Sequence, residues 1–207
     1  MGAVYFITRS VLRPLTWTYL GLRSRGSDRI PRRGGVLIVA NHCSHLDPVV
    51  LGCSAGRPLS FLARATLFKP KPFAWLLRKL GTIPLAQGQG DRGAIDLAVN
   101  LLREGRALAI FPEGTRSHDG RLGEAKGGAG LLALRAGVPI LPAHIAGTHQ
   151  SMPRGVSFPR PGRVRVHWGE PLTAEELIRR HPTGAKSARA VVHALMEEIR
   201  ALGGEDA

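Results

Sequence analysis

The sequence contains few cysteines, few aromatic residues and no long apolar run, and each shortage excludes a class of protein. Cys43 and Cys53 stand ten positions apart, a spacing that fits neither a metal knuckle nor a redox CxxC pair and favours a reducing compartment. A helix needs about 20 consecutive apolar residues to cross a bilayer, and no segment of the sequence supplies them. The glycine-rich loop of P-loop nucleotide-binding proteins and the Gly-x-Ser-x-Gly elbow of serine hydrolases are also missing.

Acidic residues are scarce as well. Fifteen Asp and Glu stand against 29 Lys and Arg, which leaves a formal charge of +14. Such a charge attracts anionic surfaces, either nucleic acid or anionic lipid, although a solvated basic surface without a partner has the same composition. A nucleic-acid-binding module would gather its basic residues on one helix or carry aromatic residues on strands. Here the arginines are spread along the chain, so we expect no nucleic-acid partner.

The length of 207 residues fits one globular domain, and 43% of the residues are hydrophobic. We expect residues 28–207 to form an αβ domain and residues 1–27 to form a membrane-interfacial helical segment in front of it. In that segment apolar side chains could enter the headgroup region while arginines meet lipid phosphates. The apolar side chains are Phe6, Ile7, Leu12, Trp17, Tyr19 and Leu20, and the arginines are Arg9, Arg13, Arg23 and Arg25. A helix folded onto the core fits the same residues equally well.

The order of the expected elements indicates the fold class. Apolar runs typical of strands lie at residues 35–40, 58–63, 82–85, 107–111, 138–145 and 163–168. Helical patterns lie at residues 47–55, 72–80, 95–103, 127–136 and 187–202, and a capping box at Thr173 and Glu176 opens one more helix. This alternation predicts an α/β fold, with a mainly parallel sheet flanked by helices. The run 163–168 alternates charged and apolar residues, which is typical of an edge strand.

The heptapeptide NHCSHLD at residues 41–47 follows the first buried strand, so it should project from the carboxyl end of the sheet, where α/β proteins place their active sites. A turn into a helix at Asp47 and Pro48 would bring the Asp47 carboxylate back against the His42 imidazole. A carboxylate in that position fixes the tautomer of the ring and stabilises the imidazolium. Such a dyad suits the activation of a substrate hydroxyl.

Two other interpretations of the same heptapeptide stay open. His42, His45 and Asp47, with Cys43, could be metal ligands, but the remaining histidines are scattered without ligand spacing. We therefore expect no metal. The heptapeptide could also be a polar loop whose groups are satisfied internally and which carries no chemistry.

A second polar loop, FPEGTRS at residues 111–117, follows another buried strand. Gly114 would let backbone N–H groups approach an anion, and Arg116 offers a planar guanidinium for phosphate, with hydroxyls at Thr115 and Ser117. Lys126, followed by two glycines at a possible helix start, supplies a further cation. Together these residues predict a phosphate pocket.

The two loops resemble the signature blocks of the lysophosphatidate acyltransferase (1-acyl-sn-glycerol-3-phosphate acyltransferase) family. The family patterns Asn-His-x-Ser-x-x-Asp and Phe-Pro-Glu-Gly-Thr-Arg-Ser are matched at every fixed position by residues 41–47 and 111–117. The segment VPILP at 138–142 resembles the fourth block, and FLARATLF at 61–68 resembles the segment that precedes the second. The likeness extends over roughly residues 34–146.

The resemblance implies roles for individual residues. His42 would be the general base and Asp47 its orienting partner. Glu113, Gly114, Thr115 and Arg116 would bind the acceptor, with Arg116 on the phosphate and Lys126 as an auxiliary contact. Arg64 joins this set, although lysine is common at its position. The sequence also departs from the family at Gln87, where arginine is common, which leaves another lysophospholipid or polar acceptor open.

The expected activity is therefore transfer of an acyl chain from acyl-CoA or acyl carrier protein to the free hydroxyl of a lysophospholipid, with lysophosphatidate giving phosphatidate. A thioesterase that uses the same dyad on water is the alternative. The resemblance implies no cofactor. The expected partners are the two substrates and an anionic membrane surface, and the expected location is the cytoplasmic face of the membrane, as a peripheral or monotopic protein.

Overall fold

A seven-stranded sheet forms the centre of the protein in the computed structural model, which describes residues 2–85, 90–182 and 187–204. The strand order is β1-β7-β6-β2-β5-β3-β4. The strands are β1 (Arg23–Arg25), β2 (Val36–Ala40), β3 (Leu59–Arg64), β4 (Thr82–Leu85), β5 (Ala107–Ile110), β6 (Ile140–Ala146) and β7 (Arg165–Trp168). Within the sheet only β6 and β7 pair antiparallel among the described residues. The predicted α/β fold with a mainly parallel sheet is confirmed.

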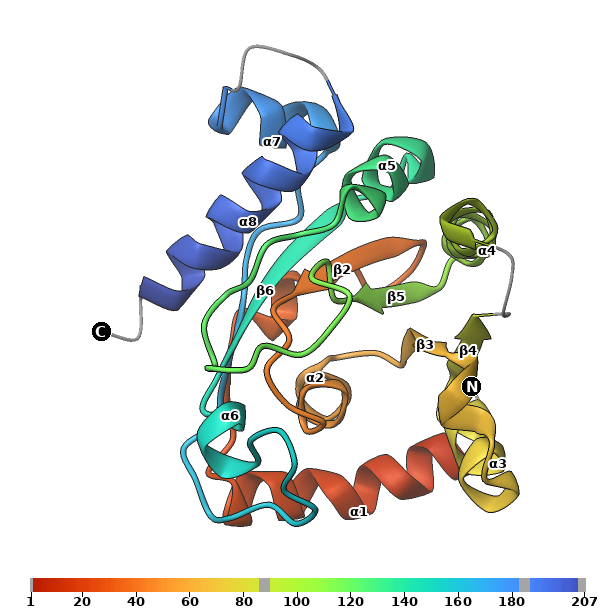
Figure 1. Ribbon diagram of the computed structural model, residues 1–207, viewed down its shortest axis with the longest axis vertical. Helices are drawn as coiled ribbons and strands as arrows, with labels where there is room; N and C mark the ends of the chain where they lie inside the picture. The colour runs from red at the N-terminus through yellow and green to blue at the C-terminus, as the bar shows by residue number, and fades with distance from the viewer. Residues whose placement is uncertain (1, 86–89, 183–186, 205–207) are drawn as a thin grey trace.

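Helices cover both faces of this sheet (Figure 1). The central strand β2 is apolar on both faces, so each face needs a cover of helices. Ile38 belongs to one apolar cluster, Leu37 and Val39 belong to the other, and all three are fully buried. The first cluster lies under α2 (Asp47–Ser54), and α1 (Ala3–Tyr19) packs outside α2. The second lies under α4 (Gly90–Arg103), α5 (Gly127–Ala136) and α8 (Ala188–Gly204).

The connections between parallel strands decide which helix lies on which face. β2 to β3 and β3 to β4 both advance in the same direction across the sheet, so right-handed crossovers place α2 and α3 (Lys71–Lys79) on one face. β4 to β5 and β5 to β6 run back in the opposite direction, which places α4 and α5 on the other face. Helices α2 and α3 therefore lie on the face of the sheet on which α1 also lies, outside α2 (Figure 1).

The prediction that residues 163–168 form an edge strand is wrong. Strand β7 lies between β6 and β1, and Val166 and Trp168 are buried. The edge on this side of the sheet is β1, whose three residues Arg23–Arg25 pair in parallel with β7. This strand belongs to the segment 1–27 that we predict as interfacial, so that segment contributes to the sheet as well as carrying α1.

Other boundaries differ by a few residues. Helix α4 begins at Gly90, before the expected residue 95, and α8 continues to Gly204. Thr173 and Glu176 form the predicted capping box at the start of α7 (Ala174–Arg180). Short 3-10 helices at Ser27–Arg29 and Ala65–Phe68 (η1 and η2) and the helix α6 (Thr148–Ser151) complete the fold. Gln87 lies outside the described residues.

Helix α1 combines a packed side with an exposed apolar side. Tyr5 and Thr16 are buried, and the Arg9 guanidinium donates to the backbone carbonyls of Gly52 and Ala55 at the end of α2. Phe6, Ile7, Val11, Leu15, Trp17 and Tyr19 are exposed. No helix in the described part of the chain is long and apolar enough to cross a membrane. The placement of α1 on a membrane surface stays a prediction.

Gly130 tests the packing of α5 on α8. A β-carbon at Gly130 would lie 1.9 Å from the Ala188 carbonyl oxygen, so Gly130→Ala must push the two helices apart. We expect a loss of about 1–3 kcal/mol in the free energy of unfolding, measured by urea denaturation. The matched control is Gly128→Ala in the same helix, where a β-carbon meets nothing within 4 Å. The control should be neutral or slightly stabilising, and equal losses in both variants would contradict this account.

Candidate active site

The predicted dyad of His42 and Asp47 is formed. His42 Nδ1 lies 2.8 Å from Asp47 Oδ2 in the loop that joins β2 to α2, at the carboxyl end of the central strand. The Asp47 side chain is fully buried, whereas 17% of the His42 side chain is exposed. A carboxylate accepts only, so this contact places the proton on Nδ1 and leaves the Nε2 lone pair available as a base.

Asp47 acts on the loop and not on the helix that it begins. Its Oδ2 also accepts hydrogen bonds from the backbone N–H groups of Cys43 and Ser44, at 2.7 and 2.8 Å. The N-terminus of α2 has no side-chain capping hydrogen bond. Asp47 therefore holds the loop backbone and the imidazole with the same oxygen, which couples the shape of the loop to the orientation of the base.

Two further contacts fix the histidine loop. The His42 ring stacks on Phe111, with ring centroids 4.0 Å apart and planes inclined by 14°. The Asn41 amide donates to the Ile145 carbonyl at 2.8 Å and accepts from the Ile145 N–H at 2.7 Å, so it continues the pairing of β2 with β6. Both partners come from neighbouring strands. The loop is thus held on either side before any substrate binds.

Glu113 joins the two signature loops. Its Oε1 accepts from the His42 backbone N–H at 2.9 Å, and its Oε2 accepts from the Gly123 N–H at 3.3 Å. Burial raises the pKa of the Glu113 carboxyl, and these two hydrogen bonds oppose that shift. The resemblance implies that Glu113 binds the acceptor, yet in this structure its carboxylate binds the backbone. Gly123 had no role in the sequence analysis, although a β-carbon there would lie 2.9 Å from Glu113 Oε2.

Arg64 and Lys126 converge on Gly114. The Arg64 guanidinium donates to the Gly114 carbonyl at 3.2 Å from the end of β3. Gly114 has φ +67°, which favours glycine, and a β-carbon there would lie 3.1 Å from Lys126 Cδ, Cε and Nζ. The structure therefore brings together two cations that stand 62 positions apart in the sequence.

Arg116 lies in the same loop, within electrostatic reach of Arg154 and of the Asp47 carboxylate. Burial lowers the pKa of the Arg116 guanidinium, and Arg154 acts in the same direction. Arg154, in the segment after α6, was not predicted as a site residue; it contacts His118. Within the described ranges, no carboxylate forms an ion pair with Arg64, Arg116 or Lys126. Thr115, Arg116 and Ser117 line a hollow beside Glu113. An anionic group would find three cations around Gly114 and Arg116 that no carboxylate of the described chain pairs with.

The arrangement of His42, His45 and Asp47 does not resemble a metal site. Asp47 Oδ2 already accepts from His42 and from two backbone N–H groups, and the His45 side chain is exposed. Partial burial of the ring lowers the pKa of His45, and Arg116 and His42 act in the same direction. In the part of the chain that the structure describes, no group of three or more His, Cys, Asp or Glu could hold a metal ion. The expectation that no metal takes part remains a prediction.

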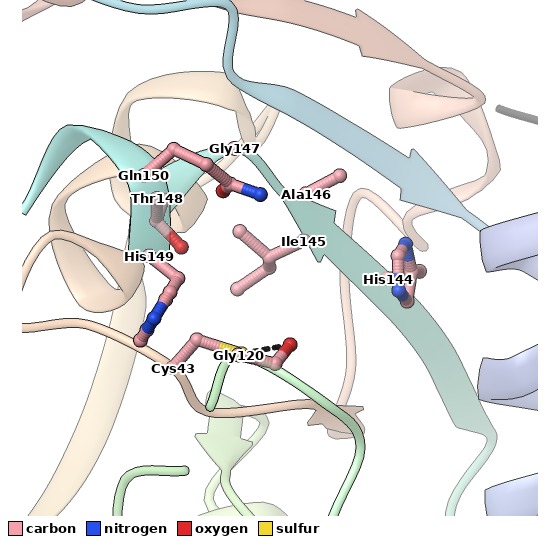
Figure 2. Close-up of a pocket in the computed structure, with 9 residues that line it drawn as sticks. All are labelled: Cys43, Gly120, His144, Ile145, Ala146, Gly147, Thr148, His149 and Gln150. Atoms are coloured by element: carbon pink, nitrogen blue, oxygen red, sulfur yellow. Dashed lines mark hydrogen bonds between the residues drawn. The ribbon is translucent and has the colours of Figure 1, made fainter. Parts of the chain in front are cut away.

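A small pocket lies behind the histidine loop (Figure 2). Its lining includes Cys43, Gly120, Ile145, Thr148 and His149. The Cys43 thiol donates to the Gly120 carbonyl at 3.5 Å. Burial, together with the nearby Asp47 carboxylate, raises the pKa of Cys43 to about 12. A thiol held protonated is a poor nucleophile, so Cys43 is a packing residue in this loop.

Thiol labelling tests this conclusion. Burial raises the pKa of Cys53 as well, so neither thiol should react with iodoacetamide in the native protein near pH 8. Both should react once guanidinium chloride has unfolded the chain, as counted by mass spectrometry. Rapid labelling of Cys43 in the folded protein would contradict its protonated, buried state.

Known proteins resemble this chain over the region that contains the two signature loops. The family model described as Acyltransferase matches residues 21–146, which include both signature loops. A 1-acyl-sn-glycerol-3-phosphate acyltransferase from Brassica napus chloroplasts is 37% identical over 138 residues, 65% of this chain and 40% of the relative. A lyso-ornithine lipid O-acyltransferase from Pseudomonas aeruginosa is also 37% identical, over 62% of this chain and 49% of its own length. These relatives are longer, and this chain spans less than half of each.

A solved structure extends the similarity to nearly the whole chain. The 1-acyl-sn-glycerophosphate (LPA) acyltransferase PlsC from Thermotoga maritima superposes with a TM-score of 0.77 at 28% identity. The match covers 97% of this chain and 79% of the PlsC chain. The likeness therefore includes α1 and the C-terminal helices, which lie outside the residues that the family model matches.

Proposed function

We propose that this chain, which belongs to the acyltransferase family, moves an acyl chain from a thioester to the free hydroxyl of a lysophospholipid, most simply lysophosphatidate giving phosphatidate. One observation carries the proposal. The Glu113 carboxylate ties the loop of the His42–Asp47 dyad to the segment 111–123, which carries Arg116, and Arg64 and Lys126 approach that segment at Gly114. A base beside an anion site is what the hydroxyl of a phosphate-bearing lipid requires.

In the proposed reaction, His42 Nε2 takes the hydroxyl proton of the acceptor as its oxygen attacks the thioester carbonyl. The new C–O ester bond forms, the C–S bond breaks, and the proton passes from Nε2 to the departing sulfur, so that a free thiol leaves. Asp47 holds the ring and stabilises the imidazolium during this step. The donor is acyl-CoA or acyl carrier protein, and no further cofactor is needed for the balance of atoms.

The headgroup of the acceptor would be bound by Arg116, with Arg64 and Lys126 beside Gly114 and with Thr115 at the rim of the hollow. Guanidinium groups bind phosphate through paired hydrogen bonds, which favours lysophosphatidate. The Pseudomonas relative is named for a lyso-ornithine lipid, so an acceptor with a different polar headgroup is the second candidate.

We further propose that the chain works on an anionic membrane surface, at its cytoplasmic face, as a peripheral or monotopic protein. Support comes from the exposed apolar side chains of α1 and from the formal charge of +14. The Arg13 guanidinium lies 5.5 Å from the centre of the exposed Trp17 ring, a pairing suited to the boundary between headgroups and acyl chains.

The test is thiol release from an acyl-CoA in the presence of lysophosphatidate, lyso-ornithine lipid or no acceptor, with the lipid product identified by mass spectrometry. Acceptor-dependent release that yields diacylated lipid supports transfer. The acceptor that is acylated faster identifies the preferred headgroup. Release without acceptor would mean thioester hydrolysis and would overturn the proposal. Acyl carrier protein thioester replaces acyl-CoA in a parallel series.

A further inference from the structure

The segment 65–79, which comprises η2 and α3, presents apolar and basic side chains to solvent. Leu67, Phe73 and Trp75 are 43%, 47% and 55% exposed, and only Ala74 of α3 is buried. Isolated exposed apolar residues are ordinary, but a helix with two exposed aromatic residues in its first two turns indicates a contact surface.

The charge of this segment limits the partner. Lys69, Lys71, Arg78 and Lys79 belong to it, and the sequence has no acidic residue between Asp47 and Asp91. The Arg78 guanidinium lies 5.4 Å from the centre of the Phe68 ring. Two copies of such a face would oppose like charges, which disfavours self-association. An anionic bilayer offers an apolar boundary for Phe73 and Trp75, and it offers negative charge for the lysine and arginine side chains.

The position of the segment in the fold supports the same partner. Helix α3 lies on the face of the sheet that carries α1, which has its own exposed apolar side and also contains no acidic residue (Figure 1). At the other end of α1, the Tyr19 hydroxyl donates to Pro159 beside the 81% exposed Phe158. Exposed apolar groups thus occur on three separate segments of one side of the molecule.

From these observations we propose that η2 and α3 form a second membrane-docking element. Phe73 and Trp75 would lie at the boundary between headgroups and acyl chains, and the four lysine and arginine side chains would contact anionic lipid. The inference rests on the proposed action at a membrane and extends it beyond α1. Arg64, next to η2, donates to the loop that holds the unpaired cations, so docking of α3 would set the mouth of the site at the lipid surface. A lysophospholipid could then present its headgroup to Arg116 while its acyl chain remains in the bilayer.

The experiment measures binding of the full chain to phosphatidylcholine vesicles with and without phosphatidylglycerol, in the absence of substrate. Phe73→Ala with Trp75→Ala should weaken partitioning into anionic vesicles by at least about tenfold. Lys69→Gln with Lys71→Gln should weaken it by roughly fivefold per charge, and only where phosphatidylglycerol is present. The matched control is Leu131→Ala with Leu134→Ala, two exposed residues of α5 on the opposite face, which should bind like the wild type.

A second measurement keeps the apolar residues of α3 in place. Trp168 is buried, so in a Trp17→Phe background Trp75 is the exposed tryptophan among the described residues, and lipid carrying brominated acyl chains should quench it. Unchanged vesicle binding by the aromatic variant, or an unquenched Trp75, would overturn the proposal. So would a dimer in sedimentation that the aromatic variant abolishes, because the face would then bind a second copy.

A soluble assay separates this inference from the proposed reaction. With a short-chain, monomeric lysophosphatidate, the aromatic variant should transfer acyl groups at the rate of the wild type, because Phe73 and Trp75 are exposed on α3, which packs on η2 and β4. Failure of the proposed function would make both proteins silent in this assay while leaving vesicle binding intact. If the docking proposal is wrong, the wild type and the aromatic variant will both be active and will bind equally to vesicles.

Discussion

Replacing His42 with alanine is expected to lower kcat/KM for acyl transfer by about 10³–10⁴-fold, because the acceptor hydroxyl loses its general base. The His42 ring is held in place by the Asp47 carboxylate and by stacking on Phe111, and the His42 backbone N–H donates to the Glu113 carboxylate. The measurement is acceptor-dependent thiol release at saturating acyl-CoA. The side chain is partly exposed and its removal leaves Asp47 bonded to two backbone N–H groups, so the melting temperature should fall only slightly.

The matched control is His193→Ala, an exposed histidine on α8 on the opposite face of the sheet. It should retain wild-type activity. A His42→Ala protein that folds and still transfers acyl chains within about tenfold of the wild-type rate would refute the assignment of the base.

Replacing Asp47 with asparagine is expected to lower kcat by about 10²–10⁴-fold with little change in KM for either substrate. The amide oxygen can still accept from the Cys43 and Ser44 N–H groups, so the loop keeps its shape. What is lost is the negative charge beside Nδ1, 2.8 Å away, which stabilises the imidazolium as the hydroxyl proton is taken. An increase in KM without a fall in kcat would show that Asp47 serves binding and not proton transfer.

The control for this variant is Asp96→Asn on α4. Asp96 forms an exposed ion pair with Arg135 at 2.8 Å, and exposed pairs contribute about 0–1 kcal/mol to stability. Its loss should leave kcat unchanged. Comparing urea midpoints of the two variants separates a catalytic effect at Asp47 from general destabilisation.

The local sequence was enough to predict most of the sheet and the dyad. Residues 36–40 are apolar and flanked by Gly35 and Asn41, so a strand buried on both faces was the natural prediction. His42 and Asp47 are near neighbours, and the turn between them depends on residues of the same loop. Both features depend on residues that are close together in the sequence, so they could be predicted without knowledge of the fold.

Long-range contacts account for what the sequence analysis missed. Strand β1 consists of Arg23, Ser24 and Arg25, which have no strand-like pattern, and it forms because Arg23–Arg25 align with Arg165–His167 across the chain. The contacts of Glu113 with two backbone N–H groups likewise depend on how separate loops meet. Arg154 reaches the neighbourhood of Arg116 through the path of the segment after α6, which no local pattern encodes.

Helix α2 links the reaction centre to the outer helix. Asp47 begins it, and at its other end the carbonyls of Gly52 and Ala55 accept hydrogen bonds from the Arg9 guanidinium of α1. A helix of this length is about 12 Å long and resists compression. Helix α2 therefore couples the position of the His42 loop to that of α1. With α1 on a lipid layer, as proposed, a shift of α1 caused by headgroup packing would reach the base through α2, so that turnover would respond to the state of the membrane as well as to the chemistry of the pocket.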